Sequence, residues 1–372
     1  MPNCASCRQS ITDTYVQWGR QVYHPQHFTC AACAKAIGTG SFVPYQGRPY
    51  HQACYVESFA ERCKHCGQPI AGKFFKHKGR AYHDHCYRDY IAERCEICQK
   101  PIMDRFIPEK GKAYHEACYQ KTLAEKCAVC TTGLTGQYFI DPWGNKYHAA
   151  HQKQMPHCEY CSRIMSSRTS DGGYTYGDGR HICGICYSSR VPSDREARPL
   201  IARVRERMRV WGLDVPEEAA PVKLVDRTAL HNLLRRSGHP AGPKVNGFTS
   251  VLIEKQGNQV IKREMAVYIL FGMPRELFEG TVAHELTHVW VNLHNGRKLD
   301  PAFEEGSCNY MKYLIHQGSE SALAPHAIKS MEQDPDPAYG QGFRRASKYV
   351  ERNGLPALLA NLAKSTGFPF GY

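Results

Sequence analysis

The hydrophobic pattern of this chain is clearest in its C-terminal half. Residues 278–290 carry apolar positions at the spacing of an amphipathic α-helix. Two runs rich in β-branched and aromatic residues precede it, at 248–255 and 260–271, with a Gly-Asn pair at 257–258 between them. This order predicts a β-hairpin and then a helix, which Pro274 can open at its first position.

A second helix is predicted further toward the N-terminus. Residues from about 195 to 212 place apolar side chains on one face and arginines on the other, and Ser193 or Asp194 can cap the start. We expect this helix to dock one domain on another rather than to bind nucleic acid. A strand at 223–226 and a short helix at 227–236 follow.

The N-terminal half repeats a pair of cysteines instead of a hydrophobic pattern. Seventeen of the 18 cysteines lie between Cys4 and Cys186. Cys-x2-Cys pairs recur, with later steps of 31 to 33 residues, and a second pair of Cys or His follows each after 16 to 21 residues. This spacing is typical of zinc sites and not of a disulfide framework. Seventeen cysteines and seven histidines would fill six closed, structural four-ligand sites. The predicted sets are Cys4, Cys7, His24 and His27; Cys30, Cys33, His51 and Cys54; Cys63, Cys66, His83 and Cys86; Cys95, Cys98, His115 and Cys118; Cys127, Cys130, His148 and His151; and Cys158, Cys161, Cys183 and Cys186.

Each finger is expected to contain short β-hairpins and a short helix. The sequence predicts hairpins at 74–82 and 106–114, and helices at 87–94 and 119–126. Each finger has too few apolar residues to fold alone, so zinc binding would supply the folding free energy.

The first two zinc sites resemble a LIM domain. Residues 23–30, Tyr-His-Pro-Gln-His-Phe-Thr-Cys, are similar to the central signature of that family, and His27 stands where the family usually has cysteine. The following fingers are joined by eight-residue spacers and are LIM-like single fingers. The resemblance implies a protein-binding arm; the alternative is a rigid spacer.

The formal net charge of +13 suggests a nucleic-acid partner until the metal sites are considered. Residues 1–194 hold 24 Lys and Arg against 16 Asp and Glu. Seventeen thiolates and six zinc ions would lower the charge of this half to about +3. We therefore expect no nucleic-acid partner.

The predicted helix at 278–290 contains the motif HExxH. His284 and His288 are one turn apart, so both can bind one zinc ion, and Glu285 can take a proton from a metal-bound water. The strand just before this helix is expected to border a substrate cleft, where an extended peptide could pair with a sheet edge.

Two residues compete to be the third zinc ligand, His294 and Glu305. His294 lies six residues after His288, but a continuing helix would turn it away from the ligand face, so we expect a surface histidine near a helix end at Gly296. Glu305 lies where the next helix opens, which would give a site of two histidines from one helix and a glutamate from another, with a fourth position open for water. This arrangement resembles that of the gluzincins, whose glutamate ligand is often followed by glycine, and the resemblance favours Glu305. Glu304 is the alternative, or else a solvated first-turn carboxylate. Asn309 could orient a ligand.

Peptide hydrolysis also needs a donor for the oxyanion, usually Tyr or His. Tyr310, His316, His326 and Tyr339 are available, and the sequence does not choose between them. The remaining cysteine, Cys308, is expected to be a small buried apolar residue.

Six segments of the second half, 178–180, 270–275, 284–290, 304–306, 339–344 and 366–369, follow one another in a recognisable order. In this order they resemble the DA-one peptidases, which are LIM-containing plant growth regulators with ubiquitin-linked activity. The resemblance covers nearly all of residues 158–372 and the first LIM module. It implies cleavage of protein substrates at few sites, with ubiquitin or a ubiquitin-like protein as a further partner. Plant members carry ubiquitin-interacting motifs ahead of the LIM domain, whereas this chain begins at its first zinc ligand, and its compactness suggests a bacterial relative.

The expected fold is α+β, with a finger array followed by a gluzincin-like peptidase domain. The predicted domains are a LIM domain at 1–56, three single fingers at 57–153, a sixth finger at 154–192 and the peptidase at 193–372. The predicted function is that of a zinc-dependent endopeptidase with Glu285 as general base, and the alternative is a non-catalytic LIM-type adaptor. No secretion signal or apolar span is seen, so we expect a cytoplasmic protein without a membrane partner.

These assignments predict the metal content. Metal analysis of the purified chain should find about seven zinc ions, six in closed sites and one in an open site. A content of four or fewer would contradict the assignment of the ligand sets.

Overall fold

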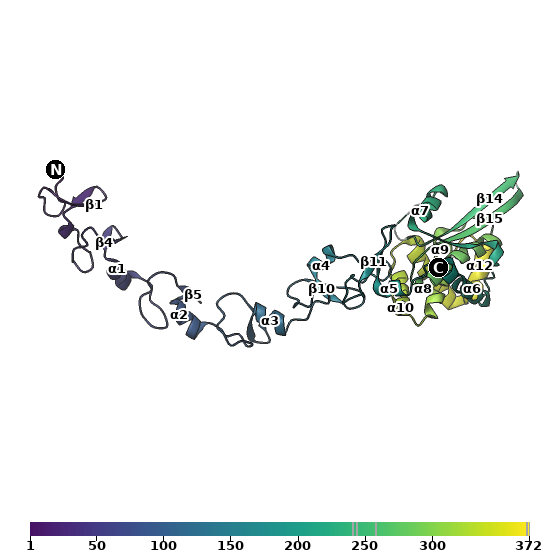
Figure 1. Ribbon diagram of the computed structural model, residues 1–372, viewed down its shortest axis with the longest axis horizontal. Coiled ribbons are helices and arrows are strands. Elements are labelled where there is room, and N and C mark those ends of the chain that lie inside the picture. The colour runs from purple at the N-terminus through teal and green to yellow at the C-terminus, as the bar shows by residue number, and fades with distance from the viewer. Residues whose placement is uncertain (240–241, 243–244, 257–258, 370, 372) are drawn as a thin grey trace. The chain divides into compact units, whose positions relative to one another are not determined.

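The structure is a computed structural model, and it describes residues 1–239, 242, 245–256, 259–369 and 371 (Figure 1). The chain divides into two compact units, Met1–Ala124 and Glu125–Tyr372. The fifth and sixth fingers therefore pack with the helical C-terminal region. The predicted domain boundary at 192/193 falls inside the second unit.

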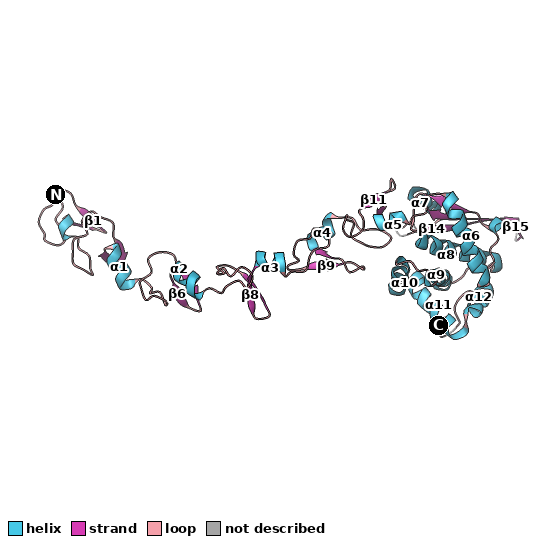
Figure 2. Ribbon diagram, turned by 60° about the horizontal axis from the view of Figure 1, so that its bottom comes forward, coloured by secondary structure: helices cyan, strands magenta, loops and turns pink. Residues whose placement is uncertain are grey.

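Every finger contains a two-stranded antiparallel hairpin, which confirms the expected β-hairpin modules. An isolated β-bridge spans each Cys-x2-Cys turn, as between Arg62 and Pro69 in the third finger. Figure 2 shows these modules as short strands and helices within long loops. The hairpins are β1 Val16–Trp18 with β2 Gln21–Tyr23, β3 Val43–Tyr45 with β4 Arg48–Tyr50, β5 Phe75–His77 with β6 Arg80–Tyr82, β7 Phe106–Glu109 with β8 Lys112–His115, β9 Tyr138–Ile140 with β10 Lys146–His148, and β11 Gly173–Thr175 with β12 His181–Cys183.

The finger helices begin earlier than the sequence predicted. The predicted helix at 119–126 is α3, Glu116–Thr122, and its N-cap residue is the ligand His115. The predicted helix at 87–94 is replaced by two shorter pieces that follow the ligand His83. The reason is the metal geometry, because a histidine at the cap and a cysteine three residues later in the first turn face the same point. The helices are η1 Pro25–His27, α1 Gln52–Phe59, α2 Asp84–Cys86, η2 Tyr87–Ile91, α3, α4 Ala149–Gln154 and α5 Gly184–Ser188.

The second unit contains a three-stranded sheet in the order β13-β15-β14. The strand β15 (Gln259–Leu270) lies in the middle, parallel to β13 (Val222–Val225) and antiparallel to β14 (Gly247–Gln256). The sequence predicted both hairpin strands, but it placed an open edge on β15. In the described sheet β15 is paired on both sides, and β13 and β14 form the edges. The predicted turn at 257–258 lies outside the described residues.

Helices pack beside the sheet, with α8 (Arg275–His294) at their centre. Four helices contact α8, namely α6 (Asp194–Val210), α9 (Pro301–Gln317), α10 (Leu323–Gln333) and α12 (Leu355–Lys364) (Figure 2). Pro274 is the N-cap residue of α8 rather than its first helical residue, and Asn295, not Gly296, caps its end. The other elements are η3 Glu217–Ala219, α7 Arg227–Arg236, η4 Pro337–Gln341 and α11 Gly342–Asn353.

The helix predicted at 195–212 is α6, and its apolar face is buried in the core of the second unit. Ser193 is its N-cap residue, with Asp194 and Glu196 in the first turn, where negative charge favours a helix start. The core continues from the sixth finger through α6 and α8 to α12. Among the described residues, no helix combines the length and apolar character needed to cross a membrane.

Candidate metal centre

The two histidines of the HExxH motif lie together on α8, where almost every residue from Phe278 to Val291 is buried. The rings of His284 and His288 have centroids 5.0 Å apart and are inclined by 70°. Because their positions differ by one helical turn, both rings project from the same face. That face is turned toward α9, which packs along α8.

Glu305 on α9 completes a three-residue cluster. Its Oε2 lies 3.2 Å from Nε2 of His284 and 3.5 Å from Nε2 of His288. Ligand atoms of tetrahedral zinc, each about 2.0–2.1 Å from the metal, lie roughly 3.3 Å apart. This Oε2 is buried, and it accepts no hydrogen bond from the described residues. A buried carboxylate oxygen that faces two ring nitrogens without a hydrogen bond fits a metal ligand. Burial alone would raise the pKa of Glu305, but His288 and His284 outweigh it and hold that pKa below its ordinary value.

Each histidine is oriented through its second ring nitrogen. Nδ1 of His284 lies 3.1 Å from Oδ1 of Asn309, and Nδ1 of His288 lies 3.0 Å from Oε1 of Glu304. Such partners fix the ring orientation and leave Nε2 free to bind a metal. The expectation that Glu304 could be a merely solvated carboxylate was wrong, because consecutive residues of α9 point in different directions and Glu304 reaches the far side of the His288 ring.

Glu285 is held by the edge strand of the sheet. Oγ1 of Thr249 donates to Oε2 of Glu285 at 2.7 Å and to its carbonyl oxygen at 3.0 Å. Gly247 lies against the same side chain: a Cβ there would come within 2.7 Å of Oε1 of Glu285. Sequence reasoning missed both residues, since nothing in the local sequence of β14 indicates a contact with a helix about 36 residues later.

The structure separates the four candidates for the oxyanion donor. The Tyr339 ring lies parallel to the His284 ring, with centroids 6.3 Å apart. Although the Tyr339 side chain is partly exposed, desolvation, and then the nearby Glu305 carboxylate, raises its pKa, so its hydroxyl remains a donor at neutral pH. Asn309 donates to the carbonyl of Tyr339 at 3.1 Å, which ties η4 to the histidine site.

The other three candidates lie elsewhere. Tyr310 packs against Tyr313 in the core. His316 is 1% exposed next to Gly280, and burial, reinforced by Lys312 and Arg207, lowers its pKa to about 3. His326 lies beside Trp143 of the fifth finger.

Two further residues can now be placed. His294 is exposed at the last position of α8, stacked on Trp290, and its Nδ1 lies 2.8 Å from the Trp290 carbonyl. It does not join the cluster. Cys308 is fully buried, as expected, but it lies beside His288. Burial raises the pKa of its thiol to about 12, although His288 acts in the opposite direction.

The finger ligands form compact clusters. In each of the first five predicted sets the four ligand atoms lie within 4.8 Å of one another, which supports structural zinc. In the sixth set all four cysteines are at most 2% exposed, and Sγ of Cys161 lies 3.6 Å from Sγ of Cys183.

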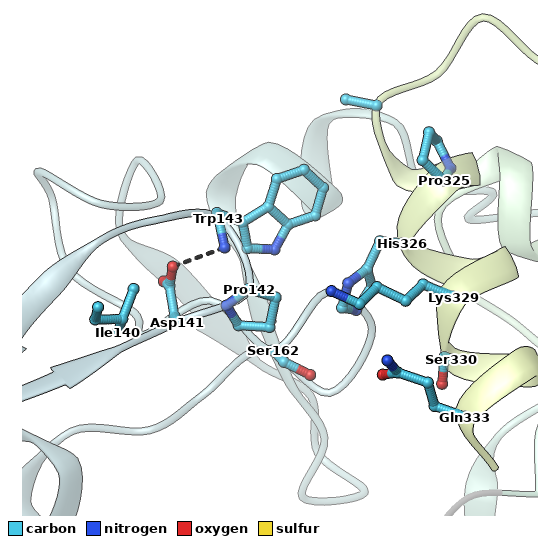
Figure 3. A pocket seen from close by; sticks show the side chains of 11 residues that line it. Ile140, Asp141, Pro142, Trp143, Ser162, Pro325, His326, Lys329, Ser330 and Gln333 are labelled. Atoms are coloured by element: carbon cyan, nitrogen blue, oxygen red, sulfur yellow. Dashed lines mark hydrogen bonds between the residues drawn. The ribbon is translucent and has the colours of Figure 1, made fainter.

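A separate cavity of about 540 Å³ lies between the β9–β10 turn of the fifth finger and α10. Figure 3 shows Trp143 and Pro142 on one side and His326 and Lys329 on the other. None of the histidine-site residues lines it. We therefore place the candidate chemistry at the α8–α9 cluster and not in this cavity.

Comparisons with known proteins match one family in the N-terminal half of the chain and another in the C-terminal half. Residues 4–59 match the LIM domain family, and residues 222–317 match the DA1-like family, described as Protein DA1. The chain carries a LIM domain and a DA1-like domain. The predicted resemblance is thereby confirmed, and the DA1-like match contains His284, Glu285, His288 and Glu305.

Similar proteins extend the likeness over 98% of the chain. Protein DA1-related 1 and Protein DA1 of Arabidopsis thaliana, and LIM domain-containing protein HDR3 of Oryza sativa subsp. japonica, are each 26% identical to it. The chain spans 66%, 68% and 74% of their respective lengths. Each of these relatives therefore contains sequence beyond the part that aligns with the DA1-like and LIM regions here.

The contact between Glu304 and His288 gives a prediction about metal affinity. Replacing Glu304 with Ala should weaken zinc binding at the histidine site by about 10- to 100-fold, because the ring loses the partner on Nδ1. Competition with a graded series of zinc chelators measures the affinity. His294→Ala is the matched control and should leave it unchanged. Equal affinities for Glu304→Ala and the unmodified protein would contradict the orienting role, and loss of zinc in His294→Ala would make His294 the third ligand.

Proposed function

We propose that this protein is a zinc-dependent endopeptidase that hydrolyses peptide bonds of protein substrates. The observation that carries the proposal is the buried Oε2 of Glu305, which faces Nε2 of both His284 and His288. Three ligands of this kind leave a fourth position for water or substrate, which is the arrangement of catalytic rather than structural zinc.

A bound zinc ion would supply Lewis acidity, which polarises a carbonyl group and lowers the pKa of water. The chain's own residues would then divide the remaining tasks. His284, His288 and Glu305 hold the metal. Glu285, steadied by the Thr249 hydroxyl, takes the proton from the attacking water and passes it to the leaving amine.

Tyr339 is the residue best placed to stabilise the oxyanion. Its ring is next to the metal-binding histidine His284, and its hydroxyl stays protonated at neutral pH. It is carried by η4, whose first turn is capped by Asp336 through the backbone N–H groups of Ala338 and Tyr339.

The fingers would bind protein partners. LIM domains in general mediate protein interactions, and residues 4–59 match that family. The fifth finger also exposes three consecutive hydrophobic side chains on β9, namely Tyr138, Phe139 and Ile140. Exposed apolar residues grouped in this way are typical of an interaction surface. The identity of the partner, and any role of ubiquitin, remain predictions from the family resemblance.

Replacing Glu285 with Gln tests the activity directly. Cleavage should fall by about 100-fold or more, since the amide cannot accept the proton, while fold and zinc content stay the same. Comparing new protein N-termini in cells that express the unmodified protein or Glu285→Gln reveals both activity and substrates. Cleavage that persists in Glu285→Gln would remove the residue from its role, and identical N-termini in both would favour a non-catalytic adaptor.

Replacing Tyr339 with Phe tests the oxyanion donor. The rate constant kcat should fall by about 10- to 1,000-fold with little change in KM, because the lost hydrogen bond forms only in the transition state. Tyr310→Phe is the matched control and should keep full activity. An unchanged kcat in Tyr339→Phe would rule out this assignment.

A further inference from the structure

The sixth finger differs from the others in how deeply it is built into its unit. Its ligands Cys158, Cys161, Cys183 and Cys186 belong to the same buried core as Phe278, Val282 and Leu286 of α8. By contrast, Cys66 of the third finger is exposed. A closed zinc site inside the core of a domain can hold neighbouring elements in place as well as fold its own loop.

The segment that follows the last zinc ligand supplies hydrogen bonds at the start of α8. The carbonyl of Ser189 accepts from the N–H of Arg275, the first residue of α8, at 2.9 Å. Val191 forms two backbone hydrogen bonds with the turn before the helix: its carbonyl accepts from the N–H of Gly272 at 2.7 Å, and its N–H donates to the carbonyl of Met273 at 2.8 Å. The first N–H groups of a helix have no partner within it. Here the finger provides one of those partners three residues after Cys186.

Arg180, three residues before Cys183, forms a second connection. Its side chain is fully buried, and its Nη1 donates to the carbonyl of Phe271 at 2.8 Å and to the hydroxyl of Tyr160 at 2.7 Å. Asp178 lies 2.9 Å from Nη2 and compensates the charge. A buried charged group held by so many partners is costly to disturb, since loss of one leaves the others unpaired.

The turn between β15 and α8 packs tightly against Tyr176 of the sixth finger. Gly272 has φ +72°, a conformation that favours glycine, and a Cβ there would come within 2.4 Å of the Tyr176 hydroxyl. That hydroxyl donates to the Gly272 carbonyl at 3.1 Å. The rings of Tyr176 and Phe271 pack edge to face with centroids 5.3 Å apart, and both lie near the Arg180 guanidinium, at 4.5 Å and 4.9 Å from it. Finger and turn therefore fit together closely.

We propose that the sixth zinc finger positions the HExxH helix, and that Arg180 is the positioning residue that couples the four-cysteine site to it. His284 lies nine residues after Arg275, about 14 Å along the helix. A displacement of the start of α8 that is carried along the helix moves both histidines relative to Glu305 on α9. Metal occupancy of the finger therefore sets the zinc affinity of the histidine site. This inference rests on the metal site of the proposed function.

The test compares three variants of the full chain. Cys186→Ser removes a ligand of the sixth site. Arg180→Lys keeps the charge and all finger ligands but loses the planar guanidinium, which donates to both Tyr160 and Phe271. Cys66→Ser is the control and removes a ligand from the third finger. Two quantities are measured: amide hydrogen exchange at residues 275–279, and zinc affinity of the histidine site by chelator competition. Neither requires catalytic turnover.

Cys186→Ser and Arg180→Lys should each raise amide exchange at 275–279 by about tenfold and lower zinc affinity at the histidine site by about tenfold. Cys66→Ser should lose one zinc and change neither quantity. Unchanged exchange and affinity in Arg180→Lys would overturn the proposal. If Cys186→Ser fails to fold, Arg180→Lys decides alone. If the histidine site of the unmodified protein binds no zinc, the proposed function is contradicted. The amide exchange of residues 275–279 in Arg180→Lys then still tests whether the finger positions α8.

Discussion

The structure of the second unit depends on one electrostatic constraint, the convergence of two imidazoles and a carboxylate at the α8–α9 contact. Oε2 of Glu305 is buried within 3.5 Å of both Nε2 atoms. An ionised carboxylate in such a place is costly unless a cation or protonated partner compensates it. A divalent metal would satisfy all three side chains together, and the proposed reaction centre is made of these same atoms.

The elements around this contact act as supports. The edge strand β14 holds Glu285 through Thr249, Asn309 joins His284 to the η4 turn, and the sixth finger caps the start of α8. The fingers of the first unit and the sixth finger differ in the core to which they belong. Fingers in the first unit have small cores of their own, such as Cys63, Ile70, Ala81, Tyr82 and Cys86, whereas the sixth shares the core of the helical region.

Much of this arrangement could be predicted from the sequence because metal sites impose strict spacing. The finger ligands and the two motif histidines follow from spacing alone, and Glu305 from the glycine after it. Thr249 and the edge position of β14 could not be predicted, since both depend on how the sheet packs on α8. Glu304 was underestimated because a turn of about 100° per residue sends adjacent side chains to different sides of one imidazole. The finger helices were misplaced because their histidine ligands, rather than propensity, set where they begin.

The most direct measurement is a crystal structure of the full chain with anomalous diffraction collected on both sides of the zinc absorption edge. The account predicts an anomalous peak about 2.0–2.2 Å from Nε2 of His284, Nε2 of His288 and a carboxylate oxygen of Glu305, with a fourth position open to solvent. A structure in which zinc fills the finger sites while Glu305 points away from both histidines, with no peak between them, would contradict it.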